Sequence, residues 1–289
     1  MLPSEAHFVR FVSLFCEVIM KHFENSPEAL KKLAEAKLFV LDMDGTLYLG
    51  DHPIDGAIAF CERVLHRGRK LLYFTNNASR NPEDYVKRLV GMGFPCKREQ
   101  IVTSGDVTIA YLNRYYPGKP VYLVGTEALE ESFRKGGIPL SEHADIVVVS
   151  FDLTLTYEKL EHACTLIRNG AAFLSTHPDI NCPTADGFIP DSGAICAAVS
   201  LSTGVAPRYF GKPYGETVEM IETITGIDRK EAVMVGDRLY TDIALGKKNG
   251  MPSLLVMSGE TTWDMVEKAQ DGEKPDLIFD SVADKRLIF

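Results

Sequence analysis

The 289-residue chain contains no run of about 20 apolar residues, so we expect no helix that crosses a membrane. It also has no surplus of positive charge: 31 Lys and Arg stand against 40 Asp and Glu, which gives a net charge of −9. Binding to nucleic acid or to an anionic membrane needs a basic surface, and we expect neither partner. A small anionic substrate stays compatible with this charge, because one local positive site is enough to bind it.

Cysteine pairs are missing too, since none of the six cysteines forms a CxxC motif. A chain of this size buries a core without disulfides, and we expect reduced thiols in a cytoplasmic protein. The apolar-rich stretch at residues 8–20 has no cationic segment before it and no obvious cleavage site, and we do not interpret it as a signal peptide. Helical spacing of apolar residues predicts that residues 1–35 form a helical extension, packed on its own domain or against a partner.

Signatures of several other chemistries are also lacking. The sequence has no GxGxxG, HExxH or GxSxG pattern. Gly211-Lys212 is followed by Pro213 instead of Ser or Thr and lacks the upstream glycine of a P-loop. A dinucleotide-binding turn, a zinc protease helix, a nucleophile elbow and a P-loop are therefore not expected.

Short all-apolar runs are present, and each is followed by polar residues or glycine. A run of this length favours a strand that is buried on both faces. Strands that alternate with helices indicate an α/β fold with a parallel sheet covered by helices. The predicted strands include 38–41, 71–74, 233–235, 253–256 and 277–279, and the predicted helices include 57–65, 82–90 and 242–248, with Gly250 as a C-cap.

The spacing of the polar segments reveals an insertion. Most of the intervals match about one strand–helix–strand repeat, but the interval from Thr75 to Lys212 spans 137 residues. The middle of this interval shows its own alternation of strand and helix patterns. We therefore expect a second α/β domain at 118–207, inserted into a core domain made of 36–117 and 208–289.

The segment at residues 42–46, Asp-Met-Asp-Gly-Thr, follows the first predicted strand. It places the carboxylates of Asp42 and Asp44 two positions apart on a turn that Gly45 relaxes. In different environments, one carboxylate can attack as a nucleophile while the other moves protons. The alternative is an Asx turn that only ends a strand, and the other polar residues expected at the same sheet edge argue against it.

Four carboxylates, those of Asp42, Asp44, Asp237 and Asp242, are expected in one cleft. Like charges about 4 Å apart repel by about 4 kcal/mol per pair at an effective dielectric constant of about 20, so this cluster needs a cation. Oxygen ligands without His or Cys favour Mg²⁺ over zinc. Lys212 adds a positive charge, and the combination suits a phosphoryl group.

These segments together resemble the motifs of the haloacid dehalogenase (HAD) phosphatase superfamily. Asp-Met-Asp-Gly-Thr, Thr-Asn-Asn at 75–77, Gly-Lys-Pro at 211–213 and Gly-Asp-Arg-Leu-Tyr-Thr-Asp at 236–242 follow in order, each at a predicted strand end. The resemblance covers about residues 38–289 and implies a Rossmann-like parallel-sheet core. The position of the insertion looks like the type II α/β cap domain of NagD-like, or 4-nitrophenylphosphatase-like, enzymes.

The resemblance implies a role for each core residue. Asp42 would be the nucleophile that forms an aspartyl-phosphate, and Asp44 would protonate the leaving alcohol and then activate water. Thr75 and backbone N–H groups near Gly45 would hold phosphate oxygens, and Lys212 would neutralise their charge. It further implies a Mg²⁺ cofactor bound by Asp42, by the carbonyl oxygen of Asp44 and by Asp237, with Asp242 orienting Lys212 or a metal-bound water.

The remaining candidates shape the pocket and its specificity. Asn76 and Asn77 are expected to shape the phosphate pocket. The cap should close over the substrate, and its loop at 176–183, with His177 and Cys182, is the candidate for substrate binding. Alternatively, His177 packs the loop and Cys182 is a small buried hydrophobe. In relatives that act on pyridoxal phosphate we expect a histidine where Cys182 stands, which argues against that substrate.

The function expected from these residues is a Mg²⁺-dependent phosphomonoester hydrolase of small phosphometabolites, such as sugar phosphates or nucleoside monophosphates. The acid at Asp44 distinguishes such an enzyme from a dehalogenase, which needs no acid there. A phosphotransferase of the same mechanism and a non-catalytic binding protein of this fold are the alternatives. By the same resemblance we expect a homodimer that forms through the cap.

Overall fold

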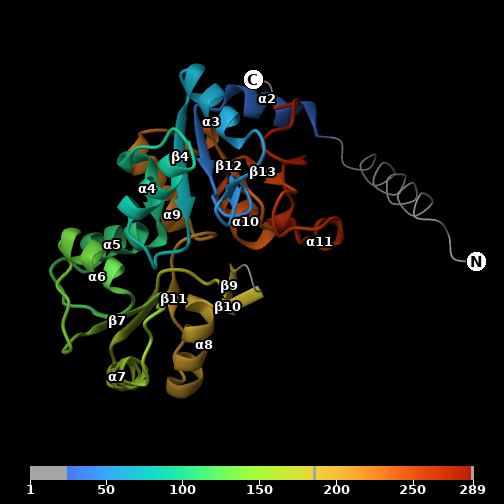
Figure 1. Ribbon diagram of the computed structural model, residues 1–289. Coiled ribbons are helices and arrows are strands. Elements are labelled where there is room, and N and C mark those ends of the chain that lie inside the picture. Colours follow the sequence, from blue (N-terminus) through green and yellow to red (C-terminus); the bar gives the residue numbers. More distant parts are fainter. Residues whose placement is uncertain (1–24, 185–186, 288–289) are drawn as a thin grey trace, which may run out of the picture.

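The computed structural model describes residues 25–184 and 187–287, and its core is a parallel six-stranded sheet (Figure 1). The strands are β1 (Leu38–Leu41), β4 (Lys70–Thr75), β5 (Ile101–Thr103), β12 (Ala232–Gly236), β13 (Ser253–Val256) and β14 (Leu277–Phe279). Their order is β14-β13-β12-β1-β4-β5, and each neighbouring pair is parallel. The predicted parallel α/β core is thus confirmed, and the five predicted apolar runs all form strands.

The order of the strands reverses at β1, in the middle of the sheet. On one side β4 and β5 follow β1 outward, and on the other side β12, β13 and β14 follow one another. Leu41 of β1 is level with Val235 of β12 and with Tyr73 of β4, so these three strands end close together. Open α/β sheets bind ligands at the carboxyl ends of their strands, where such a reversal occurs. The residues after β1, β4 and β12 therefore surround the expected site.

Helices cover both faces of this sheet. They are α2 (Pro27–Glu35), α3 (Ala57–His66), α4 (Pro82–Gly91), α5 (Ser104–Tyr115), α9 (Gly215–Thr225), α10 (Ala244–Asn249) and α11 (Trp263–Lys268). Side chains of a strand alternate between the two faces, so each strand contributes to two cores. Phe39 and Leu41 pack with apolar residues of α2, α3 and α4, whereas Leu38 and Val40 pack with those of α5, α9 and α10.

Local sequence signals set several helix ends. The Ser26 hydroxyl oxygen accepts a hydrogen bond from the N–H of Ala29 (3.1 Å) at the start of α2, as expected for an N-cap. Gly250 ends α10 with φ +73°, which confirms the predicted C-cap. The helix predicted at 242–248 is only partly α-helical, because it starts as a five-residue π-helix, η3 (Leu239–Ile243), that runs into α10.

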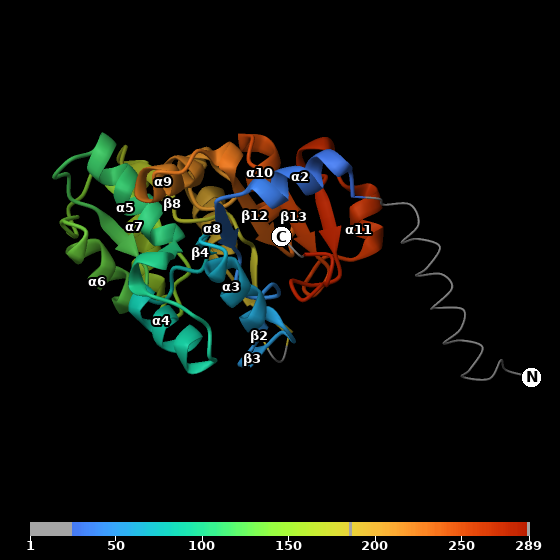
Figure 2. The same cartoon turned by 90° about the horizontal axis from the view of Figure 1, so that it is seen from above.

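The residues between α5 and α9 form a second α/β unit below the core in Figure 1. Its elements are β6 (Tyr122–Val124), β7 (Ile146–Val149), β8 (Ala172–Ser175), β11 (Arg208–Tyr209), α6 (Glu127–Lys135), α7 (Tyr157–Arg168) and α8 (Ser192–Thr203). The four strands pair in parallel in the order β11-β8-β7-β6. Figure 2, seen from above, shows much of this unit to one side of the core sheet, with α6 and α7 away from β13.

A hairpin of β9 (Asn181–Thr184) and β10 (Gly187–Pro190) projects from this unit toward the core. The segment at 176–183 was expected to be a loop, but its last residues belong to β9. Pro183 disfavours a strand because it has no N–H, yet a two-stranded ribbon leaves alternate N–H groups unpaired and so tolerates it.

The other elements are short. They are the hairpin β2 (Tyr48–Leu49) and β3 (His52–Pro53), and the single turns η1 (Arg98–Gln100), η2 (Arg229–Glu231) and η4 (Asp271–Glu273). Of the predicted N-terminal extension, α2 is described, while the helix predicted from the apolar residues of 8–23 lies outside the described residues. Within the described ranges, no helix has both the length and the apolar character that crossing a bilayer requires.

Candidate active site

The turn after β1 carries Asp42 and Asp44 and ends at the start of β2. The N–H of Gly45 donates to the carbonyl oxygen of Tyr48 (2.9 Å) and closes this turn. Gly45 has φ +85°, and a Cβ there would lie 2.4 Å from Asp237 Oδ2. Because glycine has no Cβ, the turn can approach Asp237 closely. The Gly45 N–H was expected to hold phosphate, but it already donates to Tyr48 within the turn.

Lys212, which is only 2% exposed, lies between two carboxylates. Its ammonium group forms ion pairs with Asp42 and with Asp242, the latter at 2.7 Å. Asn76 fixes the Lys212 backbone: its Oδ1 accepts from the Lys212 N–H (2.8 Å) and its Nδ2 donates to the Lys212 carbonyl (3.0 Å). The side chain of Asn76, expected in the phosphate pocket, thus holds the lysine in place.

The carboxylates of Asp42, Asp237 and Asp242 form a buried cluster, with oxygens within 4.8 Å of one another. Asp237 is oriented from two sides, because its Oδ1 accepts from the Thr46 hydroxyl (3.4 Å) and its Oδ2 from the N–H of Glu260 (2.7 Å). Three converging carboxylate oxygens with no nitrogen or sulfur donor match the ligand preference of a hard divalent cation such as Mg²⁺.

This cluster raises the pKa values of its members. Burial, together with the charges of Asp242 and Asp237, raises the pKa of Asp42 well above its usual range, although Lys212 opposes the shift. Burial and the Asp242 charge raise the pKa of Asp237 to about 7. Burial alone would lower the pKa of Lys212, but Asp242 and Asp42 outweigh it and raise that pKa. Three carboxylates with one ammonium leave an excess of negative charge that a cation would offset.

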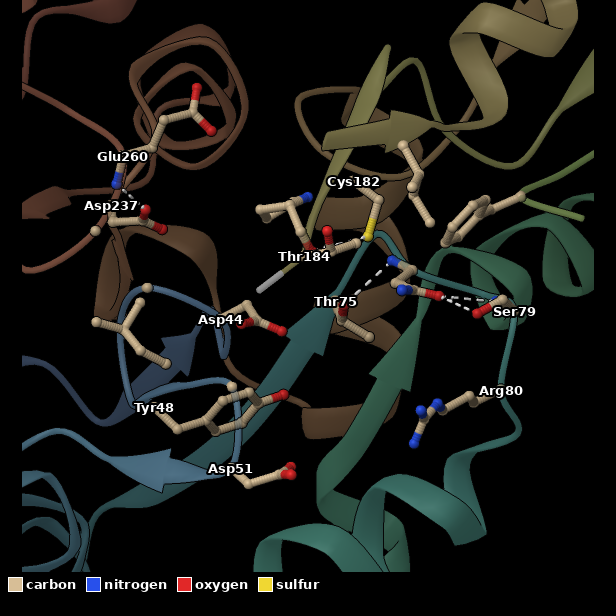
Figure 3. A pocket seen from close by; sticks show the side chains of 18 of the residues that line it. Asp44, Tyr48, Asp51, Thr75, Ser79, Arg80, Cys182, Thr184, Asp237 and Glu260 are labelled. Atoms are coloured by element: carbon tan, nitrogen blue, oxygen red, sulfur yellow. Dashed lines mark hydrogen bonds between the residues drawn. The ribbon is translucent and has the colours of Figure 1, made fainter. Parts of the chain in front are cut away.

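The segment after β4 forms a tight turn that runs toward Ser79, on the side of the site away from Asp237 (Figure 3). The Thr75 hydroxyl oxygen accepts from the N–H of Asn77 (3.1 Å). Asn77 Oδ1 accepts from the N–H of Ser79 (3.0 Å) and from its hydroxyl (2.7 Å). The Thr75 hydroxyl thus helps to close the turn, and the Asn77 side chain sets the path of the turn.

Asp44 and Thr75 face a cavity of about 810 Å³ between the core and the inserted unit. A smaller hollow of about 50 Å³ is lined by Asp42, Asp44, Thr75 and Lys212. The predicted nucleophile, acid, hydroxyl donor and lysine are therefore brought together around one small space. Burial raises the pKa of Asp44, although the charge of Arg88 opposes the shift. A raised pKa suits a general acid near neutral pH.

The two candidates from the inserted unit have different surroundings. Cys182 lines both hollows from β9, and burial raises the pKa of its thiol to about 11. His177 is fully buried and lines neither hollow: its Nε2 lies 2.8 Å from Asp191 Oδ1 and its Nδ1 lies 2.9 Å from the Thr176 hydroxyl. The geometry of His177 agrees with the alternative in which it packs the loop.

Three site residues were missed by the sequence reasoning, namely Asp179, Arg238 and Glu260. Asp179 accepts hydrogen bonds from Asn76 Nδ2 at 3.1 and 3.4 Å, so it links the inserted unit to the residue that holds Lys212. Arg238 lies 3.7 Å from Asp179 and 2.9 Å from Glu260. Asp179 lies within the segment at 176–183 and Arg238 follows Asp237 in the motif at 236–242, but no spacing rule pairs residues so far apart in the chain.

Comparisons with known proteins give consistent results. Two family models match, one described as haloacid dehalogenase-like hydrolase at residues 39–139 and one described as HAD-hydrolase-like at 209–285. An acid sugar phosphatase of Staphylococcus aureus is 39% identical over 239 residues, which are 81% of this chain and 92% of the relative.

Solved structures agree with these matches. The 4-nitrophenylphosphatase of Thermotoga maritima has a TM-score of 0.85 and 41% identity, covering 88% of this chain and 98% of its own. A structure that carries nagD in its name has a TM-score of 0.82 and 40% identity, with 88% and 98% covered.

Proposed function

The chain belongs to the haloacid dehalogenase-like hydrolase family and is a NagD-like phosphatase, and from this premise we propose that it hydrolyses phosphomonoesters with Mg²⁺ through an aspartyl-phosphate. The observation that carries the proposal is the pairing of Lys212 with Asp42 beside the hollow that Asp44 and Thr75 also line. Relatives named as acid sugar phosphatase and 4-nitrophenylphosphatase support small phosphorylated substrates, sugar phosphates among them.

The reaction proceeds in two steps at Asp42. A carboxylate oxygen of Asp42 attacks phosphorus and forms an acyl-phosphate bond, while the P–O ester bond breaks and Asp44 gives its proton to the leaving alcohol. Asp44, now ionised, takes a proton from water, whose oxygen attacks phosphorus and breaks the bond to Asp42. Inorganic phosphate leaves, and both carboxyl groups return to their first states.

Three further groups stabilise the phosphoryl group. Lys212 keeps a positive charge beside Asp42 and offsets the charge on the phosphoryl oxygens. The Thr75 hydroxyl donates to one of these oxygens. The carboxylates of Asp42 and Asp237 and the carbonyl oxygen of Asp44 would hold Mg²⁺, which supplies additional charge neutralisation when it is bound.

The inserted unit acts as a cap in this proposal, with residues 118–207 as the cap domain and 36–117 and 208–289 as the core, except that β11 (Arg208–Tyr209) pairs with β8 and so belongs to the cap. The hairpin of β9 and β10 closes the cavity from the side of the cap and keeps water from the acyl-phosphate. Cys182 contacts the leaving group from this hairpin. His177 acts indirectly, because it holds the loop that carries Asp179 against Asn76.

Phosphate release from 4-nitrophenyl phosphate and a panel of phosphometabolites tests the proposal, with Mg²⁺ and with EDTA. Asp42→Asn should abolish turnover, and Asp55→Asn, an exposed aspartate outside the cavity, is the matched control that should not. Acid-quenched wild-type enzyme should retain radiolabelled phosphate that Asp42→Asn does not. Release that is insensitive to EDTA or to the Asp42 change would contradict the mechanism, and transfer to added alcohols faster than to water would favour the phosphotransferase.

We also propose that the chain forms a homodimer through the cap. All twelve residues of α8 are uncharged, and its outer side exposes Ala197, Ala198 and Leu201, the last at 89% exposure. A helix without charge on its outer side is suited to a partner surface. Sedimentation at micromolar concentration should show a dimer that Leu201→Glu dissociates and Thr165→Glu, on α7, does not; a wild-type monomer would contradict this.

A further inference from the structure

The cavity beside Asp44 is much larger than a phosphate group needs. The small hollow at Asp42 and Lys212 is about 50 Å³, while the neighbouring cavity is about 810 Å³. Since the phosphoryl group belongs at Asp42, the larger cavity receives the leaving group. The side chains that line this cavity therefore determine which leaving groups the protein recognises.

One wall exposes large apolar side chains that come from both parts of the molecule. Leu49 of β2 is 53% exposed, Leu153 after β7 is 61% exposed and Phe188 of β10 is 70% exposed, and all three line this cavity. Exposed apolar surface that gathers in one concave place marks a binding surface. An apolar body in the cavity would cover these side chains and remove their apolar surface from water, which favours binding.

Three arginines line the cavity, and they differ in the partners that their guanidinium groups have. Arg88 donates to the carbonyl oxygen of Gly50 (2.7 Å), lies 3.3 Å from Asp51 and stacks on the Tyr48 ring. Arg238 is paired with Asp179 and Glu260, as described above. Both of these guanidinium groups are therefore balanced by protein carboxylates.

Arg80 is different, because within residues 25–184 and 187–287 no hydrogen bond or ion pair engages its guanidinium group. It lines the same cavity, five residues after Thr75 on the same turn. Figure 3 shows its side chain reaching into the open space opposite Tyr48 and Asp51. A guanidinium group presents a fork of donors that matches carboxylate and phosphate oxygens.

We propose that the substrate's leaving group combines an apolar body with an anionic oxygen group, and that Arg80 binds this anion while Leu49, Leu153 and Phe188 contact the body. This inference rests on the proposed function and narrows its substrate class. Arg80 is a specificity residue here, since it contacts the substrate away from the reacting phosphorus.

A matched pair of substrates tests the anion subsite: phenyl phosphate and 4-carboxyphenyl phosphate. For each enzyme, the ratio of kcat/KM for the carboxylated over the plain ester is measured. The ratio should fall about tenfold in Arg80→Gln, mostly through KM, because a charge-assisted hydrogen bond is lost. Arg80→Lys should keep part of the ratio, and Arg63→Gln, an exposed arginine of α3 outside the cavity, should keep all of it.

Two more measurements make the test decisive. The wild-type ratio should decrease as salt rises from 50 to 500 mM, and that dependence should weaken in Arg80→Gln.

Phe188→Ser should raise KM for phenyl phosphate about tenfold, and Tyr157→Ser, which changes an exposed aromatic residue at the start of α7, should not. An unchanged ratio in Arg80→Gln, with phenyl phosphate still hydrolysed, overturns this inference alone. A wild type that hydrolyses neither ester contradicts the proposed function as well.

Discussion

Asp237 shows how tightly individual residues are constrained at this site. A Cβ at Gly259 would lie 2.0 Å from Asp237 Oδ2, and a Cβ at Gly45 would lie 2.4 Å from the same atom. The backbone of two loops, one after β1 and one after β13, therefore touches the carboxylate directly. This enclosure holds Asp237 toward Asp42 without the need for a charged partner.

Gly259→Ala should reduce phosphatase activity by at least a hundredfold, because the new methyl group must displace the Asp237 carboxylate. Gly91→Ala is the matched control: Gly91 is the last residue of α4, has open space at its Cβ position, and should gain up to about 1 kcal/mol of stability. Activity and thermal unfolding of both variants check this. Full activity in Gly259→Ala would show that Asp237 tolerates displacement.

Asp44 should matter most for poor leaving groups. An alkyl alcohol needs a proton to leave, whereas 4-nitrophenolate leaves without one. We expect Asp44→Asn to lower kcat by about 10²–10⁴-fold for alkyl phosphates and much less for 4-nitrophenyl phosphate. Equal losses for both substrate types would mean that Asp44 acts only by holding its turn.

At the scale of elements, the start of α8 is tied to the loop after β8. Asp191 is the N-cap of α8, with its Oδ1 accepting from the N–H of Ser192 (2.6 Å), and the same oxygen lies 2.8 Å from His177 Nε2. Burial would lower the pKa of His177, but Asp191 outweighs it and raises that pKa. The proximity of Asp191 therefore favours the protonated imidazole at this junction.

The stability due to His177 should depend on pH. With a folded-state pKa above the unfolded value of about 6.5, its contribution is fully present below about pH 6.5 and is lost as the pH rises through the folded-state pKa. Denaturant unfolding should show His177→Gln destabilised by about 1–3 kcal/mol at pH 6 and by less at pH 9. His143→Gln, at an exposed histidine, should show no such dependence; a constant loss for His177→Gln would refute the charged pair.

At the scale of the whole molecule, the reversal of strand order at β1 gathers charges from distant parts of the chain. Asp42 follows β1, Asp237 follows β12 and Lys212 precedes α9; Lys212 and Asp237 are buried, and the Asp42 side chain is 14% exposed. Folding therefore brings carboxylates close enough to repel one another. We therefore expect the folded state to be stabilised by a divalent cation.

Mg²⁺ should raise the melting temperature by several degrees over the EDTA-treated protein, because a ligand that binds only the folded state stabilises it. Asp237→Asn should remove this shift, and its melting temperature in EDTA should be at least that of the wild type, since one buried negative charge is gone. Differential scanning calorimetry with and without Mg²⁺ measures both effects. An equal Mg²⁺ shift in both proteins would place the cation elsewhere.

Local sequence features account for much of what is observed. The all-apolar runs become the strands of the core sheet, because both of its faces are covered. The motif residues Asp42, Asp44, Thr75 and Lys212 meet around one hollow. The first three lie at or just after the ends of β1 and β4 at one edge of the core sheet, and Lys212 lies between β11 and α9. Burial of strands and the position of their carboxyl ends are properties that a short stretch of sequence carries.

Only the tertiary structure decided the remaining features. The link from Asp179 to Asn76 joins residues 103 positions apart, and the open position of Arg80 depends on how Arg88 and Arg238 are already paired. The β9–β10 hairpin forms although Pro183 disfavours a strand. Periodicity and local motifs report contacts within a few residues, whereas these features arise from contacts between distant segments. The sequence by itself therefore determined which polar residues meet at the edge of the core sheet, and the fold decided which side chains of the cavity are left without a partner among the described residues.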